Sequence, residues 1–124
     1  MTSSELSFLV VDDQKDITDM LDAHLSKFYK VICFNDPLEA LKNYENNPTY
    51  SIILVDYYMP NLRGDEFMDR VLTINPKQQI IAIIGSPRLS FLNIIKKYSS
   101  VVQIIEKPFQ LSELDQAIKI ATNS

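Results

Sequence analysis

Residues 51–56 read Ser-Ile-Ile-Leu-Val-Asp, a run of consecutive apolar residues that ends on a carboxylate. A strand in which successive residues are all apolar has both faces buried, which is typical of a parallel sheet covered by helices. Further short apolar runs occupy residues 6–11, 31–34, 80–84 and 101–105. Because each run is followed by a segment with helical periodicity, the sequence predicts an α/β fold.

The helical segments are marked by apolar spacing and by start and stop signals. After the first run, residues at offsets of 0, 3, 4, 8 and 11 form an inward stripe: Ile17, Met20, Leu21, Leu25 and Phe28. His24 falls on the same side, and we expect it to be a partly buried structural residue. Further helices are predicted to start at Asp36-Pro37 and at Gly64, and to cover about 88–98 and about 112–121.

Five strand-then-helix units in 124 residues predict one domain that covers residues 1–124. Crossovers between parallel strands are right-handed, which leaves few arrangements. The natural choice is a doubly wound, flavodoxin-like (βα)5 fold with a five-stranded parallel sheet in the order 2-1-3-4-5 and helices on both faces.

Composition excludes several classes of function. The net charge is -4 and the sequence pI about 4.9, a balance that disfavours direct binding to nucleic acid. Cys33 is the single cysteine, so an intrachain disulfide is excluded, and its apolar surroundings favour a small buried side chain. The sequence shows neither a signal peptide nor an apolar stretch of the roughly 20 residues that a membrane span needs. We therefore expect a cytoplasmic protein without membrane contact.

Charged residues follow three of the predicted strands. Asp12 and Asp13 follow the first, Asp56 ends the third, and Lys107 follows the fifth. The carboxyl ends of parallel strands meet at one edge of a sheet, where ligands bind in such folds. Two carboxylates 4 Å apart repel each other by about 4 kcal/mol at an effective dielectric of 20. Three carboxylates beside one ammonium therefore suggest a site for a hard divalent cation, and Mg²⁺ fits best; a solvated acidic cluster is the alternative.

At these positions the chain resembles the receiver domain of bacterial two-component signalling, over essentially its whole length. Four stretches carry the resemblance: residues 10–13, Val-Val-Asp-Asp; 54–60, Leu-Val-Asp-Tyr-Tyr-Met-Pro; 64–67, Gly-Asp-Glu-Phe; and 106–109, Glu-Lys-Pro-Phe. The resemblance implies a response regulator that takes a phosphoryl group from the phosphohistidine of a sensor histidine kinase or phosphotransfer protein. It implies no enzymatic turnover beyond self-phosphorylation from a donor and slow autodephosphorylation.

The resemblance also implies a role for each matching residue. Asp56 would accept the phosphoryl group, and Lys107 would bind one of its oxygens. Asp13 would bind Mg²⁺ directly, Asp12 largely through water, and Tyr58 through its main-chain carbonyl. The bond from Lys107 to Pro108 is expected to be cis. Because Tyr58 is bulky and adjoins the expected path of the hydrolytic water, we also expect slow dephosphorylation.

The sequence departs from the family pattern where a phosphorylated receiver changes conformation. Ile84 stands where a Thr or Ser hydroxyl usually bonds the phosphoryl group, and Ile104 stands where an aromatic residue is usual. We therefore expect phosphorylation to be retained while its conformational readout is weakened or rerouted, unless Ser86 supplies the missing hydroxyl.

Two other functions stay open. A phosphorylation-independent receiver-like interaction module would explain Ile84 and Ile104, and a Mg²⁺ phosphohydrolase would share the acidic site but has Tyr58 where that class needs a second Asp. A surplus of apolar residues on helix 88–98 further suggests a homodimer or effector surface that includes this helix and residues 101–121; loose packing is the alternative. The chain ends just after its last predicted helix, so we expect no effector domain in it.

Overall fold

The computed structural model describes residues 6–85, 96–97 and 100–123. Its five-stranded sheet has the order β2-β1-β3-β4-β5, and every neighbouring pair is parallel. The strands are β1 (Ser7–Val11), β2 (Lys30–Phe34), β3 (Ile52–Asp56), β4 (Gln79–Ile84) and β5 (Val102–Glu106). The described helices are α1 (Lys15–Leu25), α2 (Pro37–Asn46), α3 (Gly64–Ile74) and α5 (Leu111–Thr122). The predicted fold and strand order are confirmed.

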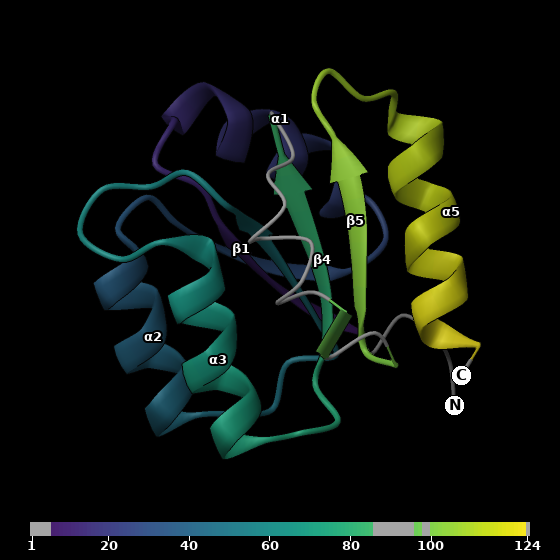
Figure 1. Ribbon diagram of the computed structural model, residues 1–124. Coiled ribbons are helices and arrows are strands. Elements are labelled where there is room, and N and C mark those ends of the chain that lie inside the picture. Colours follow the sequence, from purple (N-terminus) through teal and green to yellow (C-terminus); the bar gives the residue numbers. More distant parts are fainter. Residues whose placement is uncertain (1–5, 86–95, 98–99, 124) are drawn as a thin grey trace.

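Helices cover both faces of the sheet (Figure 1), with α1 and α5 on one face and α2 and α3 on the other. The pleat divides the strand side chains between these two layers, because successive residues point to opposite faces. In β3, Ile53 packs with the α2–α3 layer, whereas Ile52 and Leu54 pack with the α1–α5 layer. The all-apolar character of the strand runs follows from this double burial.

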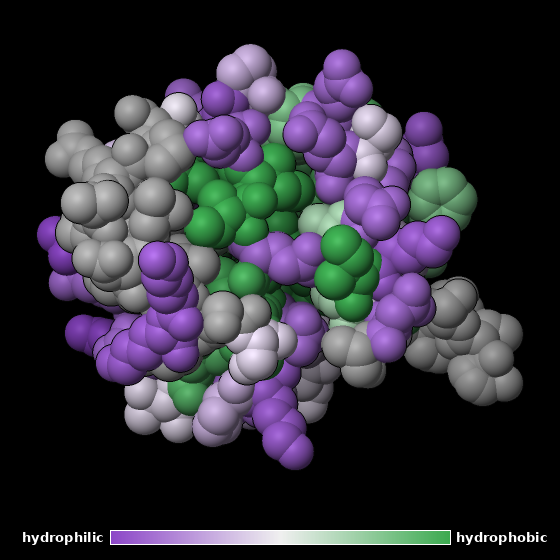
Figure 2. Space-filling view, turned by 45° about the vertical axis from the view of Figure 1, so that its right-hand side comes forward, coloured by the Kyte–Doolittle hydropathy of each residue, from purple (hydrophilic) through white to green (hydrophobic). Residues whose placement is uncertain are grey.

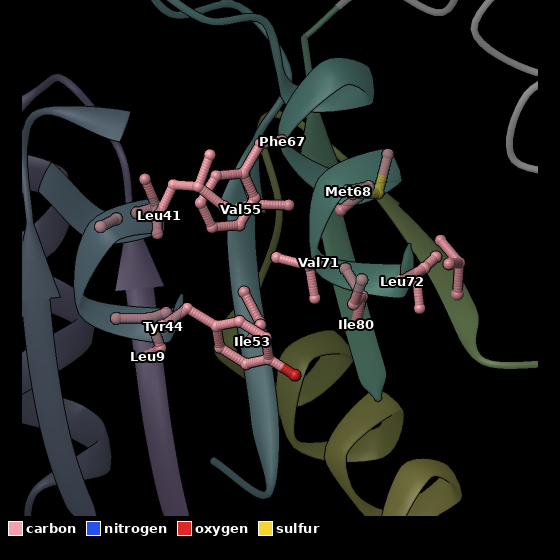
Figure 3. Packing of buried hydrophobic residues seen from close by; sticks show 14 of the residues in the cluster. Leu9, Leu41, Tyr44, Ile53, Val55, Phe67, Met68, Val71, Leu72 and Ile80 are labelled. Atoms are coloured by element: carbon pink, nitrogen blue, oxygen red, sulfur yellow. The ribbon is translucent and has the colours of Figure 1, made fainter. Parts of the chain in front are cut away.

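The α2–α3 layer packs tightly on the centre of the sheet (Figure 3). Phe67 and Val71 of α3 are fully buried against β3 and β4 side chains such as Ile53. Tyr44 of α2 is buried as well, and its hydroxyl donates a 2.8 Å hydrogen bond to Oε1 of Gln78. This bond satisfies a polar group that would be costly to bury without a partner. The layer therefore holds the start of α3 firmly against the sheet.

The predicted stripe of α1 is only partly correct. Leu21 and Leu25 are buried, but Phe28 is 60% exposed and Met20 is 40% exposed. Helix α1 ends at Leu25, so Phe28 lies beyond the last turn that faces the sheet. Two other apolar residues, Leu38 in the first turn of α2 and Ile74 at the end of α3, are exposed as well.

The prediction for His24 is confirmed, whereas that for Cys33 is only partly correct. His24 is largely buried, and its Nε2 lies 2.8 Å from Oδ1 of Asp115, which joins α1 to α5. Cys33 is half-buried rather than buried, and its thiol donates a weak 3.7 Å hydrogen bond to the carbonyl of Thr18. Both side chains thus have structural surroundings.

The predicted helix at 88–98 lies outside the described residues except for Lys96 and Lys97, which are helical and exposed. Among the described helices, none combines the length and the apolar character that a bilayer span requires.

Candidate functional site

The charged residues that follow the strands meet at one edge of the sheet, as predicted. Asp12 follows β1 directly, Asp56 is the last residue of β3, and β1 and β3 are neighbours in the sheet. Lys107 follows β5, and its main-chain N–H donates a 2.8 Å hydrogen bond to the carbonyl of Ile84 at the end of β4. The sheet therefore brings residues nearly a hundred positions apart in the chain to one place.

The three carboxylates form a compact cluster. One oxygen each from Asp12, Asp13 and Asp56 lies within 4.8 Å of the others. Asp12 and Asp56 are buried, with 1% and 4% of their surface exposed, whereas Asp13 faces the solvent. The cluster therefore offers oxygen ligands at the surface and in the interior of the sheet edge.

Lys107 supplies the positive charge at this edge. Its Nζ lies 3.2 Å from Oδ1 of Asp56 and 3.6 Å from Oδ2 of Asp12. The side chain is three-quarters buried, so the screening that weakens surface ion pairs is reduced here. One ammonium thus holds the two buried carboxylates together.

One positive charge is not enough to balance the cluster. Burial, followed by repulsion from Asp12, raises the pKa of Asp56 to about 6, even though Lys107 acts to lower it. Burial also raises the pKa of Asp12 above its ordinary value. Burial alone would lower the pKa of Lys107, but attraction by Asp12 and Asp56 outweighs it and raises that pKa. The arrangement favours binding of a further cation.

The ligand chemistry of Asp12 fits a metal ion. Its Oδ1 accepts a 2.9 Å hydrogen bond from the main-chain N–H of Gln14. Its Oδ2 is buried and forms no hydrogen bond with any group in the described part of the chain, apart from the longer ionic contact with Lys107. A buried carboxylate oxygen in this state, beside two more carboxylates, suits a hard divalent cation such as Mg²⁺.

A cavity of about 230 Å³ opens over the cluster and is lined by Asp13, Gln14, Asp56, Tyr58, Gly85 and Lys107. Tyr58 is partly exposed at the edge of this cavity, and its ring packs edge-on against Tyr57 at 4.6 Å. The sequence did not point to Gln14 or Gly85 as lining residues; their positions directly after Asp13 and at the end of β4 were the available signals.

The two aliphatic residues at the expected switch positions share one face of the sheet. Ile84 is fully buried in the α2–α3 layer, and Ile104 packs against the same cluster from β5. Ile84 does not line the cavity over Asp56, whereas its neighbour Gly85 does. Ser86, the suggested replacement hydroxyl, lies outside the described residues. The peptide bond between Lys107 and Pro108 is cis, as the resemblance implied.

Comparison with known proteins identifies the family. The sequence model of one protein family, the response regulator receiver domain, matches residues 8–119. The chain therefore belongs to that family of two-component signalling proteins. The response regulator receiver protein CpdR of Brucella abortus (strain 2308) is 29% identical over 112 residues, which cover 90% of this chain and 92% of CpdR. The hydrogenase transcriptional regulatory protein HoxA of Bradyrhizobium diazoefficiens is 28% identical over 115 residues, 93% of this chain but 24% of HoxA.

A solved structure agrees with this assignment. The receiver domain protein (CheY-like) of Methanospirillum hungatei JF-1 superposes with a TM-score of 0.86 at 25% identity and covers 94% of this chain and 92% of its own. Receiver domains are generally signalling modules, and they bind Mg²⁺ at a cluster of acidic residues. The present chain has such a cluster in Asp12, Asp13 and Asp56.

Proposed function

We propose that residues 1–124 form one cytoplasmic receiver domain that accepts a phosphoryl group on Asp56 from the phosphohistidine of a sensor histidine kinase or phosphotransfer protein, in a Mg²⁺-dependent reaction. The observation that carries the proposal is the position of Lys107 Nζ, which lies 3.2 Å from Asp56 and 3.6 Å from Asp12. Both of these carboxylates are buried. A buried nucleophile beside a fixed ammonium is the arrangement that phosphoryl transfer needs.

In this mechanism a carboxylate oxygen of Asp56 attacks the phosphorus of the donor in line. An O–P bond forms while the N–P bond to the donor imidazole breaks, and the imidazole takes up a proton from solvent. Lys107 moves from its ion pair with Asp56 to an oxygen of the incoming group and offsets its negative charge. The product is an acyl phosphate, which water later hydrolyses in the same cavity.

Asp12, Asp13 and Asp56, together with the main-chain carbonyl of Tyr58, would hold Mg²⁺. When bound, the ion would neutralise charge on the phosphoryl oxygens, the contribution that metal ions generally make to such reactions. The role of this chain's residues is to supply oxygen ligands at the mouth of a small cavity and to keep the nucleophile oriented toward it.

The conformational response to phosphorylation is proposed to be weak. A hydrogen bond to a charged group contributes about 1.5–3 kcal/mol, and moving a two-state equilibrium from 1:99 to 99:1 takes about 5.5 kcal/mol. With Ile84 in place of a hydroxyl residue, up to half of that coupling is missing. The buried position of Ile84 beside Ile104 supports this proposal.

The surface beside the cavity suits a protein donor. An apolar depression of about 380 Å³ is lined by Ile17, Met20, Lys107, Pro108 and Phe109. Lys107 also lines the cavity over Asp56, so the two hollows adjoin. We assign the depression to the protein that carries the phosphohistidine, because a group delivered to a buried aspartate must be held directly above it.

A second surface, between β5 and α5, suits an output partner. A shallow groove runs between β5 and α5 and includes Ile104, Gln116 and Ile120, the last of which is exposed. Figure 2, in which the α5 side is turned forward, shows hydrophobic side chains among hydrophilic ones on this face. We propose this groove as part of the contact for a second copy or an effector, a surface that the sequence also predicts to include the helix at 88–98.

The proposed function is tested by incubation with Mg²⁺ and acetyl phosphate, followed by intact-mass measurement. We expect one added phosphoryl group, which Asp56→Asn abolishes and chelation of Mg²⁺ prevents. Absence of the adduct in the wild-type chain would contradict the proposal and favour the interaction module, for which Ile84 and Ile104 are the supporting observations. Steady release of phosphate from a phosphomonoester would instead favour the phosphohydrolase.

The donor contact is tested separately with Met20→Lys, which places a charge in the apolar depression. Transfer from a phosphorylated kinase or phosphotransfer protein should slow at least tenfold, while the rate with acetyl phosphate stays within twofold. Ile120→Lys on α5 is the matched control and should leave both rates unchanged. Equal transfer to the wild-type and Met20→Lys proteins would remove this part of the proposal.

A further inference from the structure

Gly64, the first residue of α3, lies directly against the backbone that follows the phosphoryl-accepting aspartate. A β-carbon at Gly64 would be 2.6 Å from the Cα of Tyr57 and 2.8 Å from the carbonyl oxygen of Asp56. Nonbonded carbon atoms normally lie about 3.5–4.0 Å apart. Only a residue without a side chain allows α3 to start this close to the end of β3.

Hydrogen bonds hold the two segments at this separation. The N–H of Gly64 donates to the carbonyl of Tyr57 at 2.8 Å, and the N–H of Tyr57 donates to the carbonyl of Ile83 at 3.0 Å. The backbone that leaves Asp56 is thus held between α3 and β4. Asn61, with a φ of 74°, gives the intervening loop the left-handed turn that brings Gly64 back to Tyr57.

The chain's other glycine shows that this contact is specific. Among the described residues, a β-carbon at Gly85 would meet no atom within 4 Å. At Gly64, in contrast, the atoms in the way belong to the backbone, so the strain cannot be relieved by the rotation of a side chain. An added methyl group would have to displace either the start of α3 or the Asp56–Tyr57 backbone, by about 0.9–1.4 Å if normal carbon–carbon contact distances are to be restored.

We propose that Gly64 is a positioning residue for Asp56, an inference that rests on the phosphoryl-accepting function proposed above. The contact between Asp56 and Lys107 depends on where the backbone lies at the end of β3. The position of the Tyr58 carbonyl, which would face the metal, depends on it as well. Functional groups must be held within about 0.5 Å of their productive geometry, and a misplacement of 1 Å can cost about a hundredfold in rate. Gly64 acts through the backbone and touches neither substrate nor metal.

The test is Gly64→Ala, with Mg²⁺ affinity measured by NMR titration and phosphorylation by acetyl phosphate measured at saturating Mg²⁺. We expect Mg²⁺ to bind at least tenfold more weakly and phosphorylation to slow by about 10–100-fold. Alanine favours the helical conformation more than glycine does, so the exchange should not destabilise α3 through helix propensity. A weaker site would therefore result from the displaced backbone at Asp56 and Tyr57.

The matched control is Val71→Ala, which opens a cavity in the buried face of the same helix without approaching Asp56. It should lower the Tm but leave Mg²⁺ affinity within twofold of wild type. If Gly64→Ala is too unstable to fold in buffer, both variants are measured in trimethylamine N-oxide, which favours the folded state.

The outcomes separate the two proposals. A wild-type chain that neither binds Mg²⁺ nor gains a phosphoryl group contradicts the proposed function. A functional wild type with a folded Gly64→Ala variant of equal affinity and rate overturns the positioning role while leaving the function intact.

Discussion

The main-chain N–H of Lys107 donates a 2.8 Å hydrogen bond to the carbonyl of Ile84. Lys107, which contacts Asp56 through its ammonium, is thereby hydrogen-bonded to the residue at which the resemblance to receiver domains leads us to expect a hydroxyl side chain. The side chain of Ile84, however, is buried in the α2–α3 layer and does not line the cavity over Asp56. The backbone of Ile84 therefore connects the site to the core, and its apolar side chain can offer no hydrogen bond to the cavity.

This relationship leads to a prediction for Ile84→Thr. Because Gly85, the next residue, lines the cavity, a threonine at position 84 can turn its hydroxyl toward a ligand bound there. Beryllofluoride, a phosphoryl mimic, should then bind about 10–100-fold more tightly, because a hydrogen bond to a charged group contributes about 1.5–3 kcal/mol. Burial of a hydroxyl in an apolar cluster should also lower the free energy of unfolding of the unliganded protein by about 1–3 kcal/mol. Titration calorimetry and urea unfolding measure the two effects.

Ile84→Val is the control, since it removes one methylene and adds no hydroxyl, at a cost of about 0.5–1.5 kcal/mol. It should leave beryllofluoride affinity unchanged. Equal affinity of the Thr and wild-type proteins would count against the idea of a weakened switch.

Asp56→Asn should stabilise the metal-free protein. The pKa of Asp56 is raised to about 6, chiefly by burial and then by repulsion from Asp12, so its ionised form at neutral pH destabilises the fold. Replacing the carboxylate by a neutral amide of similar shape should raise the free energy of unfolding by about 1–3 kcal/mol. Thermal melts in EDTA measure the change.

The same exchange at the exposed Asp13 serves as the control and should change the Tm by much less. Adding Mg²⁺ should stabilise the wild type more than Asp56→Asn, because the variant has lost a ligand. A lower Tm for Asp56→Asn in EDTA would mean that the ion pair with Lys107 outweighs the repulsion.

Tyr58→Asn should shorten the lifetime of the phosphoryl group on Asp56. Tyr58 lines the cavity over the site, and its ring would restrict the approach of water to a phosphoryl group on Asp56. The smaller, polar asparagine opens that path, and we expect the half-life to fall several-fold. Intact-mass measurements after removal of acetyl phosphate follow the loss, and Tyr58→Phe, which keeps the ring, should behave as wild type. An unchanged half-life in Tyr58→Asn would discard the idea.

The sequence was sufficient to predict the fold and the meeting of the charged residues, because both follow from local features. Apolar runs give the strands, and a charge directly after a buried strand must emerge at the sheet edge, as Asp56 and Lys107 do. A contact between two backbone segments that lie apart in the chain leaves no comparable pattern in the sequence. The close approach of Gly64 to Tyr57 depends on how the loop between them folds, and periodicity alone did not reveal that α1 ends before Phe28.

Cys33 should react slowly with thiol reagents in the native protein. Burial raises the pKa of its thiol to about 11, with further contributions from the negative charges of Asp22 and Asp19. Because the thiolate is the reactive form, a pKa of about 11 leaves about 0.1% of it at pH 8, against about 10% for a thiol at the ordinary value of 9.0. Alkylation by iodoacetamide at pH 8, followed by mass spectrometry, should therefore be about a hundredfold slower in native protein than in urea.

The alkylation rate of the native protein should still rise about tenfold per pH unit between pH 8 and 10. In the unfolded chain, the rate should level off over the same range. Asp22→Asn should raise the native rate modestly, because it removes a negative charge that raises the pKa of the thiol. A native rate within threefold of the rate in urea would show that the Cys33 thiol ionises as easily as a free one, and that its hydrogen bond to Thr18 and its half-buried position do not protect it.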